Sequence, residues 1–362
     1  MAAKSSSRRV TQTDIATHAG VSVTTVSLIL SDRQEWVRQF HPETVTRVRE
    51  TAAKLGYHTN LFAAGLPTKT SPFIALIIRD FVRQDPSTWH LWAFEGELLA
   101  CVVKQGTEVG LYPIVVTVDP FADESGLQPV ENVMEGGVFG SIVRAPNVLL
   151  EKFIRHQLGR GQRIVVIFPN RPSAWPTNAI TVDDLALGRL AGQLLAAQGR
   201  KRWAVVHYRN LKVRESHAQR RKGFEQAAKE AGANVEVIKL PRLIDEVTPQ
   251  DLARIRKLAP DGLLGLDSVL AVCTLQACLT AGLRPNADFS LIGTNTGCWH
   301  NPPMPLITSL DVSWAQVGKV AIRQLLMMSE TGETQFPSIC MAPQVVPGET
   351  CPVDPDVVAN AS

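Results

Sequence analysis

The 362-residue sequence lacks the patterns that define the common membrane and enzyme classes. It has no apolar stretch long enough to span a bilayer, and no apolar segment of a secretory signal follows its basic first ten residues. The motifs G-x-S-x-G, G-x-G-x-x-G and G-x-x-x-x-G-K-[ST] are absent, and the eight histidines have no Cys, Ser or carboxylate partner at useful spacing. We therefore expect a cytoplasmic protein that is not an enzyme and that needs no cofactor or metal.

The cysteines also lack an organising pattern. The six of them show neither Cys-x-x-Cys spacing nor histidine partners at ligand distance, and they are residues 101, 273, 278, 298, 340 and 351. We expect thiols in a reducing cytosol rather than disulfides or zinc. The tail, residues 343–362, has no leucine heptads, so a tetramerising coiled coil is not expected.

Charge is distributed unevenly along the chain, although the net charge is only +3. Residues 1–70 contain nine Lys and Arg against five Asp and Glu, whereas the remainder contains 28 against 29. The positive excess therefore lies in the first 70 residues, where neutralisation of DNA phosphates would require it. A solvated basic surface is the alternative interpretation.

Residues 10–30 predict two short helices joined by a tight turn, the unit that places a row of side chains in the DNA major groove. Thr11 and Ser22 are suited to cap the two helices, and Gly20 tolerates the positive φ at which the first would end. The expected buried stripes are Ile15, Ala16 and Ala19, then Val26, Ile29 and Leu30. The outward row is Val23, Thr24, Ser27 and Leu28, whose small uncharged side chains suit base edges. An ordinary helical hairpin is the alternative.

A third helix is predicted from about residue 42 to 55. Pro42 suits its first position, and Glu43 is favoured near the positive end of the helix dipole. Its predicted buried face comprises Val45, Val48, Ala52 and Leu55, and Gly56 would end it.

Beyond residue 70, aliphatic runs alternate with helical stretches. The strand-like runs are 73–78, 114–118, 138–143, 164–168, 203–206, 235–238, 263–266 and 289–292. The helical stretches lie near 94–109, 125–135, 147–159, 185–198, 215–231, 249–258, 269–281 and 314–329. Aliphatic strands joined by helices indicate parallel sheets, and eight such strands suit two doubly wound lobes. A ligand would bind between the lobes, beyond the carboxyl ends of the strands.

The amino-terminal segment resembles the DNA-binding domain of the lactose repressor/galactose repressor family of bacterial transcription factors. The residues that carry the resemblance are Val10-Thr11, Asp14-Ile15-Ala16, Ala19-Gly20-Val21-Ser22, Thr25-Val26-Ser27, Pro42-Glu43-Thr44 and Leu55-Gly56-Tyr57. A weaker match continues through most of the chain. The resemblance implies an α/β fold class, in which an all-α helix-turn-helix domain precedes a two-lobed, periplasmic-binding-protein-like effector domain.

The implied domains are a helix-turn-helix domain at 1–58, a hinge helix and linker at 59–70, a two-lobed domain at 71–347 and a tail at 348–362. Lobe 1 would contain residues 71–168 and 296–333, and lobe 2 residues 169–295 and 334–347, with chain crossings near 168, 295 and 334. The segments 32–40 and 79–93 are longer than the family's usual connections, and 79–93 is a candidate cover for the cleft.

The resemblance also implies a homodimer on a near-palindromic operator. The implied DNA contacts are Thr13, Ser22, Val23, Thr24, Thr25, Ser27, Leu28, Ser31, Tyr57, Asn60, Ala63 and Leu66. In the family the hinge helix wedges a leucine, here Leu66, into the minor groove. Leu28 stands where most members carry an arginine that reads guanine, so we expect an operator unlike the family's usual one.

The implied effector contacts are Arg144, Arg214, Ser216, Arg220, Asp267 and Asn295. Asn295 stands where an aspartate is usual, and Asp267 is interpreted as capping the helix near Val269 or contacting the ligand. A neutral sugar and an acidic or phosphorylated one both remain open, because the arginines add donors. Trp89, Trp92 and Trp175 could stack on a sugar, although packing is the favoured interpretation for each.

The expected function is that of a transcriptional regulator, specifically a repressor, controlled by a small-molecule effector, with a sugar or sugar derivative as the expected class. Two alternatives remain: a two-lobed solute-binding protein without a regulatory role, and a DNA-binding regulator that no longer responds to a ligand.

Overall fold

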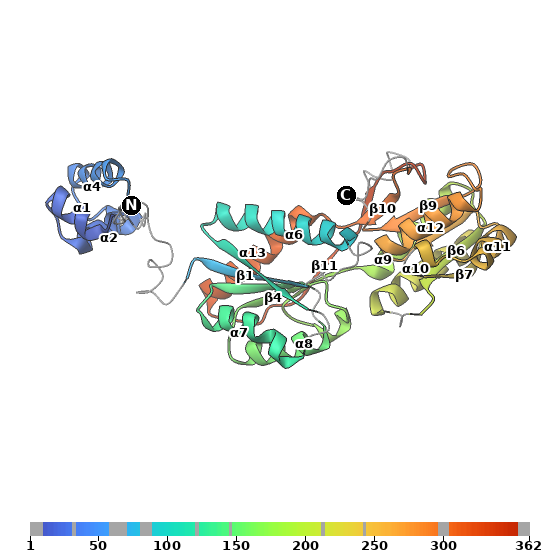
Figure 1. The fold of residues 1–362 in the computed structure, drawn as a ribbon, viewed down its shortest axis with the longest axis horizontal. Coiled ribbons are helices and arrows are strands. Elements are labelled where there is room, and N and C mark those ends of the chain that lie inside the picture. The colour runs from blue at the N-terminus through green and yellow to red at the C-terminus, as the bar shows by residue number, and fades with distance from the viewer. Residues whose placement is uncertain are drawn as a thin grey trace, which may run out of the picture. The chain divides into compact units, whose positions relative to one another are not determined.

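The computed structural model describes residues 10–30, 34–57, 71–79, 89–119, 123–144, 147–210, 214–241, 244–295 and 304–353. The chain divides into two compact units, Met1–Pro72 and Phe73–Ser362, and each is described by itself (Figure 1). Within these ranges no helix combines the length and the apolarity that crossing a bilayer requires.

The first unit is a small helical bundle. Its helices are α1 (Gln12–Ala19), α2 (Val23–Leu30), α3 (Gln34–Val37) and α4 (Pro42–Lys54). Side chains of α1, α2 and α4 meet in one core, made of Ile15, Ala16, Ala19, Val26, Ile29, Val48 and Ala52. The three predicted helices are therefore confirmed, and α3 is a helical turn within the segment that the sequence presented as a long loop.

Local chemistry fixes the ends of these helices. Thr11 and Asp14 form a reciprocal capping box at the start of α1, and Gly20 ends that helix with a φ of 66°. The Ser22 hydroxyl accepts a hydrogen bond from the Thr25 N–H at 3.0 Å, which caps α2 as predicted. Arg47 of α4 donates to the Ala19 carbonyl at 3.0 Å, so one of the last carbonyls of α1 is satisfied across the bundle.

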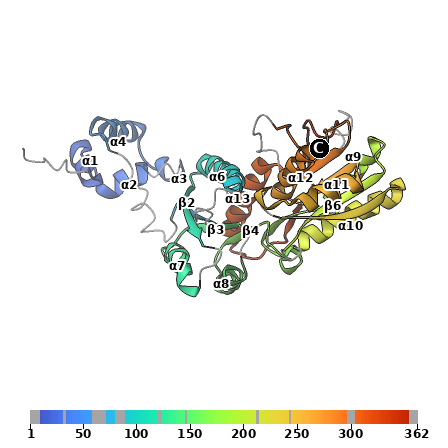
Figure 2. The same cartoon turned by 45° about the vertical axis from the view of Figure 1, so that its right-hand side comes forward.

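The second unit contains two six-stranded sheets (Figures 1 and 2). The first sheet has the order β11-β5-β4-β3-β1-β2, and all of its pairings are parallel. Its strands are β1 (Phe73–Arg79), β2 (Tyr112–Val118), β3 (Gly140–Arg144), β4 (Ile164–Ile167), β5 (Ala179–Val182) and β11 (Ile339–Met341). In Figure 1 the helices α6 (Trp89–Glu108) and α13 (Trp314–Thr331) lie on one face, and α7 (Gln128–Glu135) and α8 (Val148–Gly159) lie on the other.

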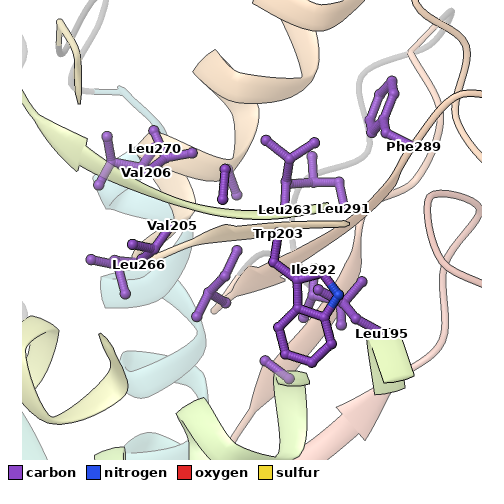
Figure 3. Packing of buried hydrophobic residues seen from close by; sticks show 14 of the residues in the cluster. Leu195, Trp203, Val205, Val206, Leu263, Leu266, Leu270, Phe289, Leu291 and Ile292 are labelled. Atoms are coloured by element: carbon purple, nitrogen blue, oxygen red, sulfur yellow. The ribbon is translucent and has the colours of Figure 1, made fainter. Parts of the chain in front are cut away.

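The second sheet has the order β12-β10-β9-β8-β6-β7, with β12 antiparallel to β10. Its strands are β6 (Arg202–Tyr208), β7 (Asn234–Leu240), β8 (Gly262–Gly265), β9 (Ser290–Thr294), β10 (Thr308–Asp311) and β12 (Gln344–Val346). Its helices are α9 (Asp184–Ala197), α10 (Glu215–Ala231), α11 (Pro249–Leu258) and α12 (Ser268–Thr280). Figure 3 shows part of its core, in which the Trp203 ring of β6 lies beside Leu195 of α9.

All the predicted strands and helices of this unit are present, and the α/β class is confirmed. The structure differs in where the chain passes between the sheets. Strands β5 and β11 pair in the first sheet, and strands β10 and β12 pair in the second. The chain therefore crosses from one lobe to the other between β5 and α9, between β10 and α13, and between β11 and β12. The expected crossings near 168, 295 and 334 are therefore displaced. The reason is that β5, β10, β11 and β12 are short and do not lie in aliphatic runs, whereas the equally short β4 and β8 do.

Helices α9 and α10 approach each other through glycine. A Cβ atom built on Gly188 would lie 1.8 Å from the Arg220 carbonyl oxygen, and one on Gly223 would lie 2.0 Å from that of Leu185. Neither position has room for any side chain, because the obstacle in each case is backbone. The close contact sets the position of Arg220, which becomes central to the site described below.

We predict that Gly188→Ala destabilises the second unit by about 1–3 kcal/mol or more, because the methyl group forces the two helices apart. Gly96→Ala in α6 is the matched control, since nothing lies within 4 Å of its built Cβ, and it should stabilise by about 0.5–1 kcal/mol. Urea unfolding of both variants measures the difference. Equal stability of the two variants would contradict the close approach.

Candidate functional site

The first unit presents the predicted row of α2 at its surface. Val23, Thr24 and Ser27 are exposed and Leu28 is half-buried, while Val26 and Ile29 face the core. The row therefore has the accessibility that contact with base edges requires.

The remaining predicted DNA contacts fall into three groups. Thr13 is exposed on α1, and Tyr57 is half-buried against the core of the unit. The Ser22 and Thr25 hydroxyls are 2.9 Å apart at the start of α2, where they take part in its cap. Ser31, Asn60, Ala63 and Leu66 lie outside the described residues.

The second unit contains a cavity of about 100 Å³ between the two sheets. Residues from the first-sheet side of its lining are Arg79, Arg144, Phe168, Pro169, Asn170, Pro172, Thr181 and Val182. Those from the second-sheet side are Asp184, Arg214, Ser216, His217, Arg220, Asp267 and Asn295. The cavity thus brings together all six residues that the sequence analysis assigned to effector contact.

Arg220 is the most constrained side chain of this lining. It is 6% exposed, and its Nε donates to the Asp184 carboxylate at 2.7 Å. Its Nη1 donates to the Leu266 carbonyl at 2.6 Å and to the Thr294 hydroxyl at 2.9 Å. Nη2 makes no hydrogen bond with any described residue, so its two N–H groups are available to a ligand.

Asp267 caps α12, as predicted, and also lines the cavity. Its carboxylate accepts hydrogen bonds from the Leu270 N–H and the Tyr208 hydroxyl, both at 2.9 Å, and lies 3.4 Å from Nε2 of His217. Burial by itself would raise the pKa of Asp267, but the hydrogen bond and charge of His217 and the Leu270 N–H hold it well below its usual range. The carboxylate is therefore ionised and committed to protein partners.

The first-sheet side contributes arginines from the carboxyl ends of neighbouring strands. Arg79 ends β1 and Arg144 ends β3, and the two strands are paired. The Arg144 guanidinium carbon lies 5.3 Å from the centre of the Phe168 ring, where a cation–π contact steadies it. Phe168 and Asn295 both have positive φ values, 47° and 56°, at the ends of β4 and β9. Such backbone is uncommon outside glycine and recurs at ligand-binding sites.

One hydrogen-bonded contact crosses between the lobes beside the cavity. Ser173 follows β4 of the first sheet, and its N–H and hydroxyl donate to the carboxylate of Glu215 at 3.1 and 2.9 Å. Glu215 is the first residue of α10, which packs with the second sheet. The two lobes are therefore joined at the cavity by a charge-assisted pair of hydrogen bonds.

Sequence reasoning missed Arg79, Asp184 and the Ser173–Glu215 contact. Arg79 directly follows the predicted strand 73–78, so the rule that ligands meet the carboxyl ends of strands pointed to it. Nothing in the sequence paired Asp184 with Arg220, which are 36 residues apart.

Trp175 packs in the protein core, as the sequence analysis favoured, and does not stack on a ligand. That side chain is 3% exposed in the core of the first lobe, with the Arg155 guanidinium carbon 4.2 Å from its ring centre, and it does not line the cavity. The side chains of Trp89 and Trp92 lie outside the described part of the chain. Within that part, no cluster of His, Cys, Asp and Glu is arranged to hold a metal ion.

A helix-turn-helix unit followed by two parallel-sheet lobes that enclose a polar cavity defines a DNA-binding regulator with a periplasmic-binding-protein-like sensor domain. Two family models agree with this class: the bacterial regulatory proteins of the lacI family match residues 11–60, and the periplasmic binding protein-like domain matches residues 193–351. The chain therefore carries a DNA-binding domain that matches the lacI family and a periplasmic-binding-protein-like domain, and it is a DNA-binding transcriptional regulator.

Individual relatives match along most of the chain. The HTH-type transcriptional regulator DegA of Bacillus subtilis strain 168 is 24% identical over 313 residues, which cover 84% of this chain and 87% of DegA. A Lac repressor dimer bound to operator and an anti-inducer has a TM-score of 0.71 at 19% identity, covering 95% of this chain and 99% of that one. A CelR–cellobiose complex has a TM-score of 0.60 at 18% identity, covering 94% and 100%. The two structures confirm the fold.

We predict that Asp184→Ala destabilises the second unit by about 3–5 kcal/mol, because it leaves the Arg220 charge buried without its partner. Glu230→Ala is the matched control, since it removes the exposed ion pair with Arg189 on the same helix pair, and it should cost less than about 1 kcal/mol. Chemical denaturation of the two variants provides the measurement. A loss below 1 kcal/mol for Asp184→Ala would show that the buried pair is dispensable.

Proposed function

We propose that this regulator binds a near-palindromic operator as a homodimer and is switched by a small molecule bound in the cavity between its lobes. The observation that carries the proposal is the convergence of all six predicted effector residues on one cavity, in a chain whose first unit exposes the α2 row. A ligand that contacts both lobes favours one lobe arrangement over others, which is the differential binding that a switch requires.

The domain roles follow the sequence interpretation. Residues 1–58 read the major groove, 59–70 form the hinge whose Leu66 enters the minor groove, and the two lobes bind effector and pair with a second copy. The first residues of the expected tail, 348–362, belong to the second lobe, because Thr350 and Cys351 are buried there and hydrogen-bond with Leu291 and Thr308. Repression is the favoured outcome, because the Lac repressor of similar fold is held on its operator in the solved complex. Since the relatives are transcriptional regulators, we assign no catalysis to the chain.

A sugar or sugar derivative is the proposed effector class. The solved relative CelR holds cellobiose, a sugar. The lining of this cavity supplies hydrogen-bonding groups suited to hydroxyls, among them Thr181, Ser216 and the Asn295 amide.

For DNA binding we predict that Leu66→Ala weakens operator affinity by about tenfold or more, because the truncated side chain no longer occupies a base step. The operator is first obtained by selecting duplexes from a random pool with the full-length protein. Fluorescence anisotropy then compares wild type, Leu66→Ala and the conservative control Leu66→Met. Selection of no preferred sequence at moderate salt would reject the proposed function, and unchanged affinity of Leu66→Ala would reject the hinge assignment.

For effector binding we predict that Arg220→Ala abolishes the change in operator affinity that the ligand causes, while operator binding without ligand persists. Because truncating Arg220 also leaves Asp184 without its buried partner, a second variant is needed. Asn295→Gly removes a cavity-lining side chain and tolerates the positive φ, so it should fold normally and lower ligand affinity. Calorimetry measures the affinity of each variant for a ligand that binds the wild type, and fluorescence anisotropy measures the change in operator affinity that this ligand causes. If both variants respond to the ligand as the wild type does, this cavity is not the effector site.

A further inference from the structure

Helix α2 has no charged residue and no amide side chain, because its sequence is VTTVSLIL. Bidentate contacts to base edges in the major groove need such groups: arginine or lysine for guanine, and asparagine or glutamine for adenine. Cytosine is read by a carboxylate, which α2 also lacks. The helix that presents the predicted row of base contacts therefore cannot form the strongest kinds of direct readout.

The apolar members of the row take no part in the core of the first unit. Val23 is 42% exposed and Leu28 is half-buried. Val26 and Ile29 are the side chains that α2 contributes to the core, and neither Val23 nor Leu28 belongs to the cluster that the described residues of this unit form. Packing within the unit therefore does not account for an aliphatic residue at either position.

The row forms one continuous face of the helix. Val23 lies four residues before Ser27, and Thr24 lies four residues before Leu28, so the members of each pair are neighbours on the helix surface. A single exposed apolar residue is ordinary on a protein. Here two aliphatic side chains and a threonine methyl group lie together on the face that is predicted to meet the bases.

The hydroxyl groups of α2 distinguish bases only weakly. Ser22 and Thr25 have their hydroxyls 2.9 Å apart, and the Ser22 oxygen accepts the Thr25 N–H, so both belong to the helix cap. Thr24 and Ser27 are exposed, but a hydroxyl both donates and accepts and can pair with any base. Discrimination by this helix therefore depends on its apolar groups.

Thymine is the base that offers an apolar group in the major groove, its C5-methyl. The edges of guanine, adenine and cytosine present polar atoms there instead. An aliphatic side chain held against those atoms would remove them from water without giving them a partner, which costs free energy. An apolar row therefore favours thymine and disfavours the other bases.

We propose that α2 reads its operator through thymine methyl groups. Val23, Thr24 and Leu28 contact the methyl groups of about two or three thymines in each half-site, so A·T pairs occupy the positions that α2 faces. The inference rests on the proposed function, because it requires α2 to lie in the major groove of an operator. The contact is uncharged, so its contribution does not depend on salt, whereas the contribution of phosphate contacts does.

The first test removes single methyl groups from the DNA. The operator is selected from a random pool with the full-length protein, and each thymine of a half-site is then replaced in turn by deoxyuridine, which lacks only the methyl. We expect affinity to fall by about threefold to tenfold at the contacted thymines, since burial of one methyl group corresponds to roughly fourfold. Fluorescence anisotropy should give the same factor at about 50 and 200 mM salt.

A rescue experiment separates methyl contact from the shape of A·T-rich DNA. Cytosine at a contacted thymine position should weaken binding, and 5-methylcytosine at that position should recover part of the loss, because it restores the methyl on a G·C pair. The methyl lies in the major groove, so these changes leave the minor-groove contact proposed for the hinge in place.

The second test pairs protein and DNA changes. Val23→Ala and Leu28→Ala should each weaken the thymine operator by about threefold to tenfold, yet have little further effect on the operator that lacks the contacted methyl. Val148→Ala is the matched control, because this valine is 80% exposed on α8 of the second unit, and it should bind both operators like wild type. Thermal unfolding confirms that the variants remain folded.

Three results would overturn the inference. They are an operator in which deoxyuridine weakens binding at no thymine, no recovery with 5-methylcytosine, and equal losses for Val23→Ala and Leu28→Ala on both operators. Failure here is distinguishable from failure of the proposed function. A selected operator that is insensitive to its thymine methyl groups rejects only this readout, whereas selection of no preferred duplex rejects the regulatory function itself.

Discussion

The buried ion pair between Arg220 and Asp184 is the interaction on which the sensor site depends. An arginine that is only 6% exposed is tolerated because its partners inside the protein are a carboxylate, a carbonyl and a hydroxyl. Leu266 follows β8 and Thr294 ends β9, so the side chain ties α10 to the carboxyl edge of the second sheet. The close glycine contact between α9 and α10 allows the Arg220 side chain to extend to the second sheet. Any side chain at Gly188 or Gly223 would displace the helix that carries Arg220.

Much of the fold followed from local chemistry in the sequence. The capping box at Thr11, the positive-φ glycine at position 20 and the proline at position 42 marked helix ends that the structure confirms. Long aliphatic runs marked the strands that are buried on both faces. Four short strands escaped because they do not lie in aliphatic runs, unlike the equally short β4 and β8. In β10 (Thr308–Asp311) the buried side chains are mostly polar. The sheet to which they belong is decided by long-range pairing, which the sequence does not display.

The candidate site was partly predictable for a different reason. The six effector residues were assigned by resemblance, and the parallel-sheet topology explains part of their convergence. Arg144, Asp267 and Asn295 lie at the carboxyl ends of strands, which meet along one edge, whereas Arg214, Ser216 and Arg220 come from the first turns of α10 and its N-cap. Trp175 shows the limit of reasoning from residue type. An aromatic ring suits a sugar in principle, but here Arg155 and the first-lobe core take up its faces. Partners such as Asp184 become visible only when the helices are packed together.

The energy needed for regulation is of the same order as one or two polar interactions at the cavity. A tenfold change in operator affinity corresponds to about 1.4 kcal/mol of differential binding between two arrangements of the lobes. A buried charge-assisted hydrogen bond contributes about 1.5–3 kcal/mol, and an exposed one such as that between Ser173 and Glu215 contributes less because solvent screens it. A few contacts made in only one lobe arrangement therefore suffice for switching. Such a switch requires no rearrangement of the large aliphatic cores of the two lobes, because the polar contacts at the cavity supply enough energy.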